Sequence, residues 1–180
     1  MEHVKKNIFQ RAAEWGLPFG LYLACTGTAA IYADRVPLFG ILFIFLTLGA
    51  PVLCYLYQRR KFIEDDGFTD FSSLWMLGIL LFILGTVVSS FIIFLVLQYL
   101  RPNFIYEQAQ ALIELYSKTP ETQNSEVLTV LKHLVEEKLL PRPIEAVFNT
   151  FWFITFTGSI SSAVTALIAG LRIKKRKPEN

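Results

Sequence analysis

The sequence predicts an all-α integral membrane protein: a bundle of four transmembrane helices, with an extracytoplasmic amphipathic helical hairpin between helices three and four. Three observations support this fold class. Of the 180 residues, 53% are hydrophobic and 18% are charged, which is more apolar than is usual for a soluble domain of this size. Four long stretches contain no charged residue and no histidine. One polar insert, residues 101–145, repeats its apolar residues with helical spacing.

Each uncharged stretch is long enough to cross a hydrocarbon core of about 30 Å, because a helix rises about 1.5 Å per residue. Together the stretches make the chain a single membrane domain, residues 1–180. The four expected spans are residues 15–33, 38–57, 72–100 and 146–171.

A short amphipathic segment precedes the first span. Val4, Ile8 and Ala12 share one helical face, so we expect a helix that lies at the inner membrane interface and leads into the span. The span lacks a small-residue cleavage site at its end, which distinguishes it from a secretory signal peptide. The link at residues 34–37 is so short that the first two spans must be antiparallel neighbours.

The second and third spans carry their own signals. Pro51 removes one helical hydrogen bond from the second span, which predicts a kink that shapes the bundle. The third span has 29 residues, so we expect it to tilt or to project beyond the bilayer. Trp75 and Tyr99, near its two ends, are typical of the aromatic residues found at membrane surfaces.

The polar insert predicts two amphipathic helices, at residues 103–118 and 124–140, separated by a turn in which Ser125 can cap the second helix. We expect their apolar stripes to press on the bundle or to lie on the outer leaflet. These stripes are Ile105, Ala109, Leu112, Ile113 and Tyr116 in the first helix, and Val127, Leu131, Leu134, Val135 and Leu139 in the second.

The distribution of basic residues predicts the orientation. Eleven of the 17 Lys and Arg residues lie before the first span, after the second or after the fourth, and these positions share one side of the membrane. Because basic loops stay in the cytoplasm, both termini are expected there. The residues expected to contact lipid head groups or a partner are Arg59, Arg60, Lys61, Lys174, Lys175, Arg176 and Lys177.

Small residues recur every fourth position in the fourth span, where Gly158, Ser162, Ala166 and Gly170 share one face. Such a face lets another helix approach the backbone closely, which is how helices associate in lipid. The pattern leaves open whether that helix belongs to this chain or to another. The corresponding residues of the first and third spans are Gly16, Gly20, Ala24, Gly85 and Ser89.

The sequence predicts no catalytic residue, no cofactor and no metal ion. Its four uncharged stretches hold no Asp, Glu, Lys, Arg or His that would mark an ion or proton path. His133 and Glu136 or Glu137 could share one helical turn, but a metal site needs further ligands, and we interpret them as a solvated face. Cys25 and Cys54 fall inside spans and are expected to be packing residues.

A family resemblance rests on the run GFTDFSSLWMLGILLFILGTVVSSFIIFLVLQYLRPNFI, residues 67–105. A glycine and aromatic residues open a long third span there, and Pro102 follows just beyond it. An outer helical segment, a fourth span rich in small residues and a basic tail come next. With these features the chain resembles an uncharacterised family of small bacterial four-span proteins, classed as a domain of unknown function. The resemblance implies a bacterial inner-membrane location and supplies no activity.

The leading hypothesis is a non-enzymatic integral membrane protein that serves as a scaffold or accessory subunit of an envelope-associated membrane complex. A more specific version is that its basic cytoplasmic face anchors a peripheral lipid-linked glycosyltransferase. The expected partners are membrane lipids and another membrane or membrane-associated protein, or a second copy of the chain, with no nucleic acid. The alternative is a small transporter or channel, with Pro51 as a hinge. Its polar path would be lined by Thr26, Thr28, Ser89, Ser90, Asn149 and Thr155.

Overall fold

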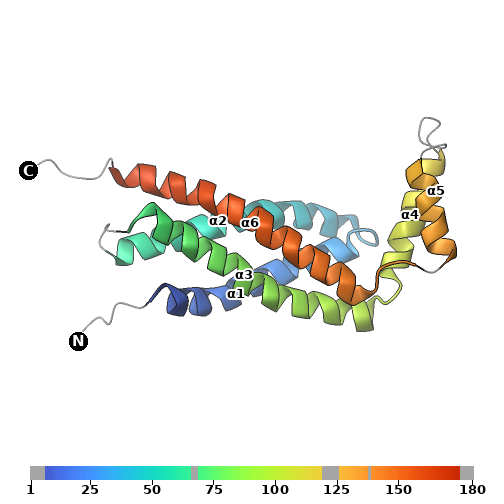
Figure 1. The fold of residues 1–180 in the computed structure, drawn as a ribbon, viewed down its shortest axis with the longest axis horizontal. Helices are drawn as coiled ribbons and strands as arrows, with labels where there is room; N and C mark the ends of the chain where they lie inside the picture. The colour runs from blue at the N-terminus through green and yellow to red at the C-terminus, as the bar shows by residue number, and fades with distance from the viewer. Residues whose placement is uncertain (1–6, 66–68, 119–125, 138, 175–180) are drawn as a thin grey trace, which may run out of the picture. The chain divides into compact units, whose positions relative to one another are not determined.

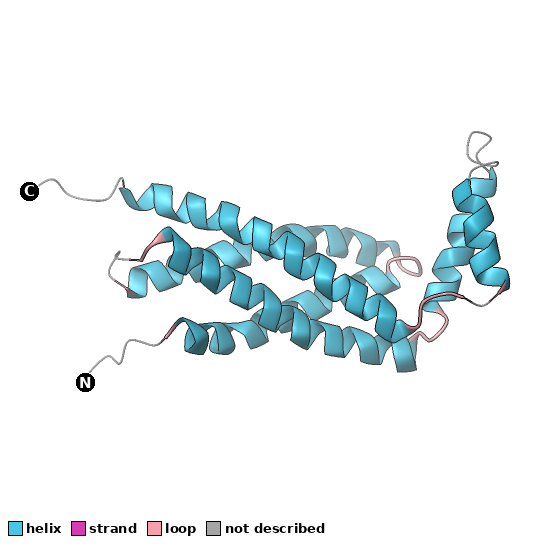
Figure 2. Ribbon diagram, viewed as in Figure 1, coloured by secondary structure: helices cyan, strands magenta, loops and turns pink. Residues whose placement is uncertain are grey.

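The structure is a computed structural model that describes residues 7–65, 69–118, 126–137 and 139–174; for Glu126 and residues 171–174 it describes the backbone only. These residues form six α-helices and one short π-helix and contain no β-strand, so the all-α fold class is confirmed (Figure 1, Figure 2). The elements are α1 (Ile8–Tyr32), α2 (Pro37–Glu64), α3 (Phe71–Leu95), the π-helix η1 (Val96–Leu100), α4 (Phe104–Lys118), α5 (Glu126–Glu136) and α6 (Pro143–Lys174).

The chain divides into two compact units. The bundle unit comprises α1, α2, α3 as far as Ile93 and α6 from Thr150 onward. The insert unit, Phe94–Asn149, comprises the end of α3, η1, α4, α5 and the first turns of α6.

Among the described residues, three helices are long and apolar enough to cross a membrane. They are α2, the continuous helix formed by α3 and η1, and α6 up to Gly170, and they correspond to the second, third and fourth expected spans. α1 is long enough with 25 residues, but it is not among them. The three candidate spans support a membrane protein, and a fourth span in α1 stays a prediction.

α2 is longer than the uncharged stretch that predicts it. It begins at Pro37, whose fixed φ suits the first turn of a helix. It continues through Pro51 and ends at Glu64 rather than at Tyr57. Arg60 and Glu64 form a salt bridge at 3.0 Å one turn apart, which supports the added turns. The basic segment after the second expected span is therefore helical.

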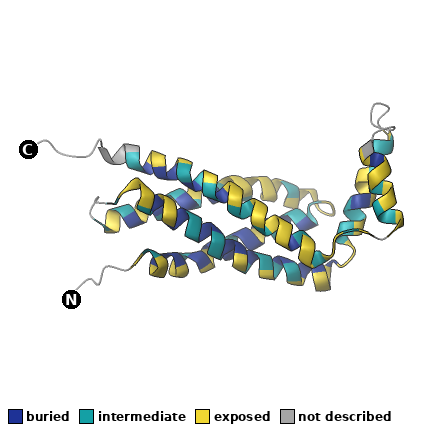
Figure 3. Cartoon of the chain, in the orientation of Figure 1, coloured by how far each residue is buried: buried dark blue, intermediate teal, exposed yellow. Residues whose placement is uncertain are grey.

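Buried residues, dark blue in Figure 3, recur along the helices of the bundle unit. Aromatic rings lie at the centre of its core. Phe19 of α1 is fully buried and meets Phe82 of α3 edge to face, with ring centroids 5.0 Å apart. Tyr57 of α2 packs edge to face on Phe19 at 6.4 Å. Aromatic rings favour this arrangement, so one side chain of α1 fixes both neighbours. The other buried members of this core are Ala12, Leu23, Ala50, Cys54, Leu77 and Leu81.

In the insert unit, α4 and α5 run in opposite directions and pack against each other (Figure 1). Ala109 of α4 and Leu128 of α5 are buried. Both helices fall where the periodicity predicts them, while the turn at residues 119–125, with its expected cap at Ser125, lies outside the described residues.

Arg101 connects the end of the α3–η1 helix to α4. Its buried guanidinium forms an ion pair with Glu107 and lies over the ring of Phe104, 5.2 Å from the ring centroid. Cations stack favourably on aromatic faces. These contacts fix the start of α4 beside the end of the preceding helix.

Candidate functional site

The most polar part of the bundle unit lies where α2 leaves its apolar stretch. Ala50, Cys54, Gln58 and Lys61 are all buried and lie three or four residues apart, so they share one face of α2. The inward face of this helix therefore changes from apolar to polar residues along its length. The side chains that meet there form what we name the polar cluster: Arg11, Gln58, Lys61, Asp65 and Ser162.

Gln58 is the centre of the polar cluster and is fully buried. Its side-chain nitrogen donates to the backbone carbonyl of Leu74 in α3 at 3.2 Å. It also lies 3.1 Å from both the carbonyl and the hydroxyl oxygen of Ser162 in α6. Ser162 donates its own hydroxyl proton to the carbonyl of Trp75 at 3.2 Å. One side chain of α2 is thus bonded to both α3 and α6.

Lys61 adds another bond of this kind. Its side chain is buried, and its ammonium group donates to the backbone carbonyl of Ser73 at 3.1 Å. Three consecutive carbonyls near the start of α3, those of residues 73–75, therefore each accept a hydrogen bond from a side chain of α2 or α6. In lipid, such interhelical bonds contribute roughly 0.6 to 2 kcal/mol each.

Gly78 gives the polar cluster its room. A Cβ atom at this position of α3 would overlap the hydroxyl of Ser162 and lie 2.8 Å from the side-chain nitrogen of Gln58. Any larger residue would push α6 away from α3 and break the bonds of Gln58. The glycine is required here by close approach, not by backbone conformation.

A partly buried ion pair joins α1 to the end of α2. The guanidinium of Arg11 donates two hydrogen bonds to the carboxylate of Asp65, at 2.9 and 3.3 Å, and one to the carbonyl of Lys61 at 3.4 Å. Asp65 also accepts a bond from the hydroxyl of Thr69 at 3.1 Å. The Arg11 side chain is 6% exposed and that of Asp65 22%. Removing one partner would leave the other charge with little water to solvate it.

Aromatic rings and an exposed cation lie beside the polar cluster. Trp15 stacks on Tyr57 with ring centroids 5.4 Å apart, and the guanidinium of Arg60 lies 5.6 Å from the Trp15 centroid. Arg60 is exposed. Half-buried tryptophan and tyrosine beside an exposed arginine are typical of a membrane–water interface.

The chemistry of the polar cluster suits helix association. The Ser162 hydroxyl contacts the amide of Gln58 and the carbonyl of Trp75, whereas a nucleophilic serine needs a base to activate it. Among the described residues, no group of three or more His, Cys, Asp or Glu side chains could hold a metal ion. The bonds observed here are ones that fix one helix against another.

The predicted small-residue face of α6 contacts other parts of the same chain along most of its length. Gly158 lies so close to the ring of Phe82 that a Cβ atom would overlap it. Ser162 belongs to the polar cluster, and Ala166 is fully buried in a second small apolar core. Gly170 differs, because a Cβ atom there would have no neighbour within 4 Å among the described residues.

The predicted glycines of α1 and α3 lie at close contacts between these two helices. A Cβ atom on Gly20 would lie 2.9 Å from the carbonyl oxygen of Gly85. A Cβ atom on Gly16 would lie 3.0 Å from the Cβ of Leu84. The other two predicted packing residues of these helices, both buried, are Ala24 and Ser89.

The basic residues that are expected to contact lipid head groups or a partner differ in their exposure. Arg59 and Arg60 are exposed. Lys61, expected to contact lipid head groups or a partner, is instead buried, because α2 continues through it and its side chain turns inward to the carbonyl of Ser73. The residues that lie outside the described side chains are Lys174, Lys175, Arg176 and Lys177.

The hydroxyl groups of the alternative polar path bond mainly to their own helices. Thr26 and Thr28 of α1 donate to carbonyls four residues earlier, at 3.0 and 2.7 Å. Ser89 of α3 donates to a carbonyl three residues earlier at 3.1 Å. Asn149 belongs to the insert unit, whereas Thr155 belongs to the bundle unit. These bonds are the common way in which hydroxyl groups are satisfied inside a helix.

Sequence reasoning did not identify Gln58, Arg11, Asp65 or Gly78 as contacts between helices. The uncharged stretch ends at Tyr57, so Gln58 lies outside the second expected span, residues 38–57. One signal is present in the sequence: the spacing of three and four residues that joins the buried positions of α2 continues through the basic triplet.

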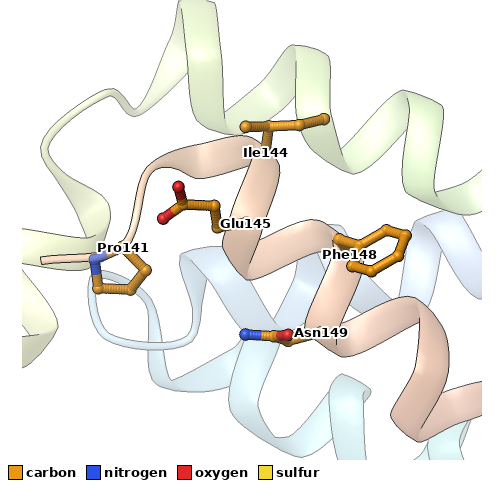
Figure 4. A pocket seen from close by; sticks show the side chains of 5 residues that line it. All are labelled: Pro141, Ile144, Glu145, Phe148 and Asn149. Atoms are coloured by element: carbon orange, nitrogen blue, oxygen red, sulfur yellow. The ribbon is translucent and has the colours of Figure 1, made fainter.

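An open groove lies in the insert unit where α6 begins, and side chains from successive turns project around it (Figure 4). Glu145 accepts a hydrogen bond from the backbone N–H of Arg142 at 3.0 Å and so caps the first turn of the helix. Its carboxylate is thereby engaged in the helix start. The groove is lined by Pro141, Ile144, Glu145, Phe148 and Asn149.

The described chain is helical, offers three candidate membrane spans and bonds helix to helix with buried polar side chains, which defines a helical protein of membrane type. A family model described as "Protein of unknown function (DUF4199)" matches residues 14–170, and the chain belongs to this family. The expected membership of a family of unknown function is thus confirmed. No curated protein and no solved structure gives a match.

Proposed function

We propose that this protein is an integral membrane protein of the bacterial inner membrane, without catalytic activity, that serves as a scaffold or accessory subunit of a membrane complex. One contrast carries the proposal. Inside the bundle unit, polar side chains bond helix to helix, whereas the outer side of α2 is apolar and exposed along most of the helix.

The exposed side of α2 suits a second membrane helix. α2 buries only 11% of its most apolar 18 residues within the protein, against 33% for the α3–η1 helix and 28% for α6. Its outermost residues follow one another at spacings of three and four. Helices that pair with a left-handed crossing use this spacing. We name these residues the α2 seam: Leu38, Ile41, Phe45, Leu48 and Val52.

The hydroxyl bonding described above supports the scaffold over the transporter, because Thr26, Thr28 and Ser89 are engaged with carbonyls of their own helices. Anchoring of a peripheral lipid-linked glycosyltransferase is a narrower form of the proposal. It depends on the basic residues that follow the fourth expected span, whose side chains lie outside the described ones, and on the exposed Arg59 and Arg60.

The test is native mass spectrometry of the protein extracted from its membrane into polymer nanodiscs, without detergent. We expect wild-type particles to contain a second copy or a further membrane protein. In the double variant Phe45→Ala with Leu48→Ala, the particles should contain a single chain of this protein. The matched control, Phe153→Ala with Phe156→Ala, changes exposed residues of α6 and should keep the complex.

Two results would contradict the proposal. A wild-type protein that is extracted only as a single chain would exclude a stable scaffold role. Equal loss of the complex in the seam variant and in the α6 control would show that the α2 seam is not the specific contact with the partner.

A further inference from the structure

We infer that the α4–α5 pair binds a lipid surface through an apolar face that is separate from the contact between its two helices. The inference concerns the insert unit alone. It rests on the membrane placement of α3–η1 and α6 that the proposed function assumes.

Each helix of the pair has two apolar sides. In α5, Leu128 is buried, yet Val127 and Val130 are 58% and 57% exposed. In α4, Ala109 is buried, while Leu112 is exposed although it lies only three residues further on. Packing between the two helices therefore leaves part of their apolar surface uncovered.

The uncovered sides lie on the same side of the pair. In α4, Leu112 and Leu115 lie roughly 60° and 120° back around the helix from Ala109, because successive residues are about 100° apart. In α5, Val127 and Val130 lie roughly 100° and 160° back, in the same sense, from the buried leucine. The two helices run in opposite directions (Figure 1). If the buried Ala109 and Leu128 mark the sides on which the helices pack, rotations in the same sense from these two residues lead to one side of the pair. We name this side the lipid face. It comprises the exposed Leu112, Leu115, Val127 and Val130 and the half-buried Leu134.

The side away from the lipid face is charged and polar. Lys118 donates a hydrogen bond to Glu114 at 2.6 Å, and this bond together with the lysine charge lowers the pKa of the Glu114 carboxyl. Thr129 and Lys132 of α5 are exposed on the corresponding side. An apolar face opposite a charged one is the pattern of helices that lie in the plane of a membrane interface.

Short chain connections keep the pair near the bilayer. α4 begins four residues after Leu100, the last residue of a candidate span, and α6 begins seven residues after α5 ends. An extended chain covers at most about 3.6 Å per residue, so these links reach about 14 and 25 Å. Tyr99, 74% exposed at the end of η1, is the kind of residue that marks the membrane surface. Lipid is thus the apolar phase within reach of the lipid face.

The test is spin-label accessibility in liposomes of phosphatidylcholine and phosphatidylglycerol. A nitroxide is attached at Val130→Cys on the lipid face, at Thr129→Cys on the polar side and at Phe156→Cys on exposed α6 as a lipid reference. Each variant carries Cys25→Ala, because Cys25 is exposed whereas Cys54 is buried. Collisions with molecular oxygen report lipid, and collisions with a water-soluble nickel chelate report water.

We expect the ratio of oxygen to nickel collisions at Val130 to match that at Phe156 and to exceed that at Thr129 several-fold. A low ratio at Val130 would place the face in water, and little collision with either reagent would mean that protein covers it. If the ratio at Phe156 is high, either result would overturn the inference about the α4–α5 pair and leave the membrane placement of α6 in force. A low ratio at Phe156 would overturn both the inference and the membrane placement of α6.

Discussion

The two halves of α2 show how this protein uses polar and apolar residues. Between Pro37 and Leu48 most side chains are large, apolar and exposed. Between Ala50 and Glu64 one face is buried, and it carries Gln58 and Lys61 bonded to neighbouring helices. In a water-soluble protein we would expect the apolar half to be buried and the polar residues to be exposed. In lipid, apolar attraction between helices is weak, so polar bonds and close contacts hold helices together.

The comparison can be tested most strongly at the polar end. Arg11→Met should lower the free energy of unfolding by about 2 to 4 kcal/mol, because Asp65 would keep its bond from Thr69 but lose its cation. Denaturant unfolding in one detergent would measure the loss. The matched control is Arg60→Met, which removes an exposed cation and should cost under about 1 kcal/mol. Equal losses would mean that the buried ion pair contributes little.

The apolar half of α2 could be predicted from the sequence, and the polar half could not. Composition and stretch length locate apolar spans because the hydrocarbon core imposes both. The role of Gln58 depends on Ser162, which lies 104 residues later. The second expected span ends at Tyr57, just before the polar residue Gln58. Nothing in the neighbouring sequence indicates that Gln58 has a partner on a distant helix.

The small-residue faces were partly predictable for a similar reason. Spacing every fourth residue identifies which side of α6 can approach another helix. It does not reveal where the neighbouring helix ends, so Gly158 and Gly170 look alike in the sequence. In the structure Gly158 meets Phe82, whereas no described residue lies near the Cβ position of Gly170. Gly78 was missed because its small partner, Ser162, lies on a different helix.

The small-residue face of α6 gives the next largest effect. Ala166 is fully buried, so Ala166→Leu should force the surrounding helices apart and cost about 1 to 3 kcal/mol. Ile168 is 46% exposed, and Ile168→Phe should change stability by less than about 0.5 kcal/mol. Thermal or denaturant unfolding of both variants in the same detergent makes the comparison. Equally small effects would show that this face of α6 meets lipid rather than protein.

A smaller effect is expected at Gln58, because its substitution has opposing consequences. Gln58→Leu removes the bonds to Leu74 and Ser162, but it also removes a buried side-chain oxygen that has no hydrogen-bond partner in the described structure. We expect a net loss of about 1 kcal/mol. The control is Gln98→Leu, at an exposed position of η1, which should be neutral. A more stable Gln58→Leu protein would show that the orphan oxygen outweighs the bonds.

The smallest effect is expected in the apolar half of α2, at Phe45. This side chain is 70% exposed, so in detergent it contacts mainly detergent molecules. Phe45→Ala therefore removes few contacts within the protein. The free energy of unfolding of the single chain should change by less than about 0.5 kcal/mol. The same substitution at the fully buried Phe19, which packs on Phe82 and Tyr57, should cost about 3 kcal/mol. Denaturant unfolding of the two alanine variants, at equal detergent concentration, measures the difference. If Phe45→Ala instead costs as much as Phe19→Ala, the exposed half of α2 must pack against protein in detergent as well, and the loss should then depend on protein concentration.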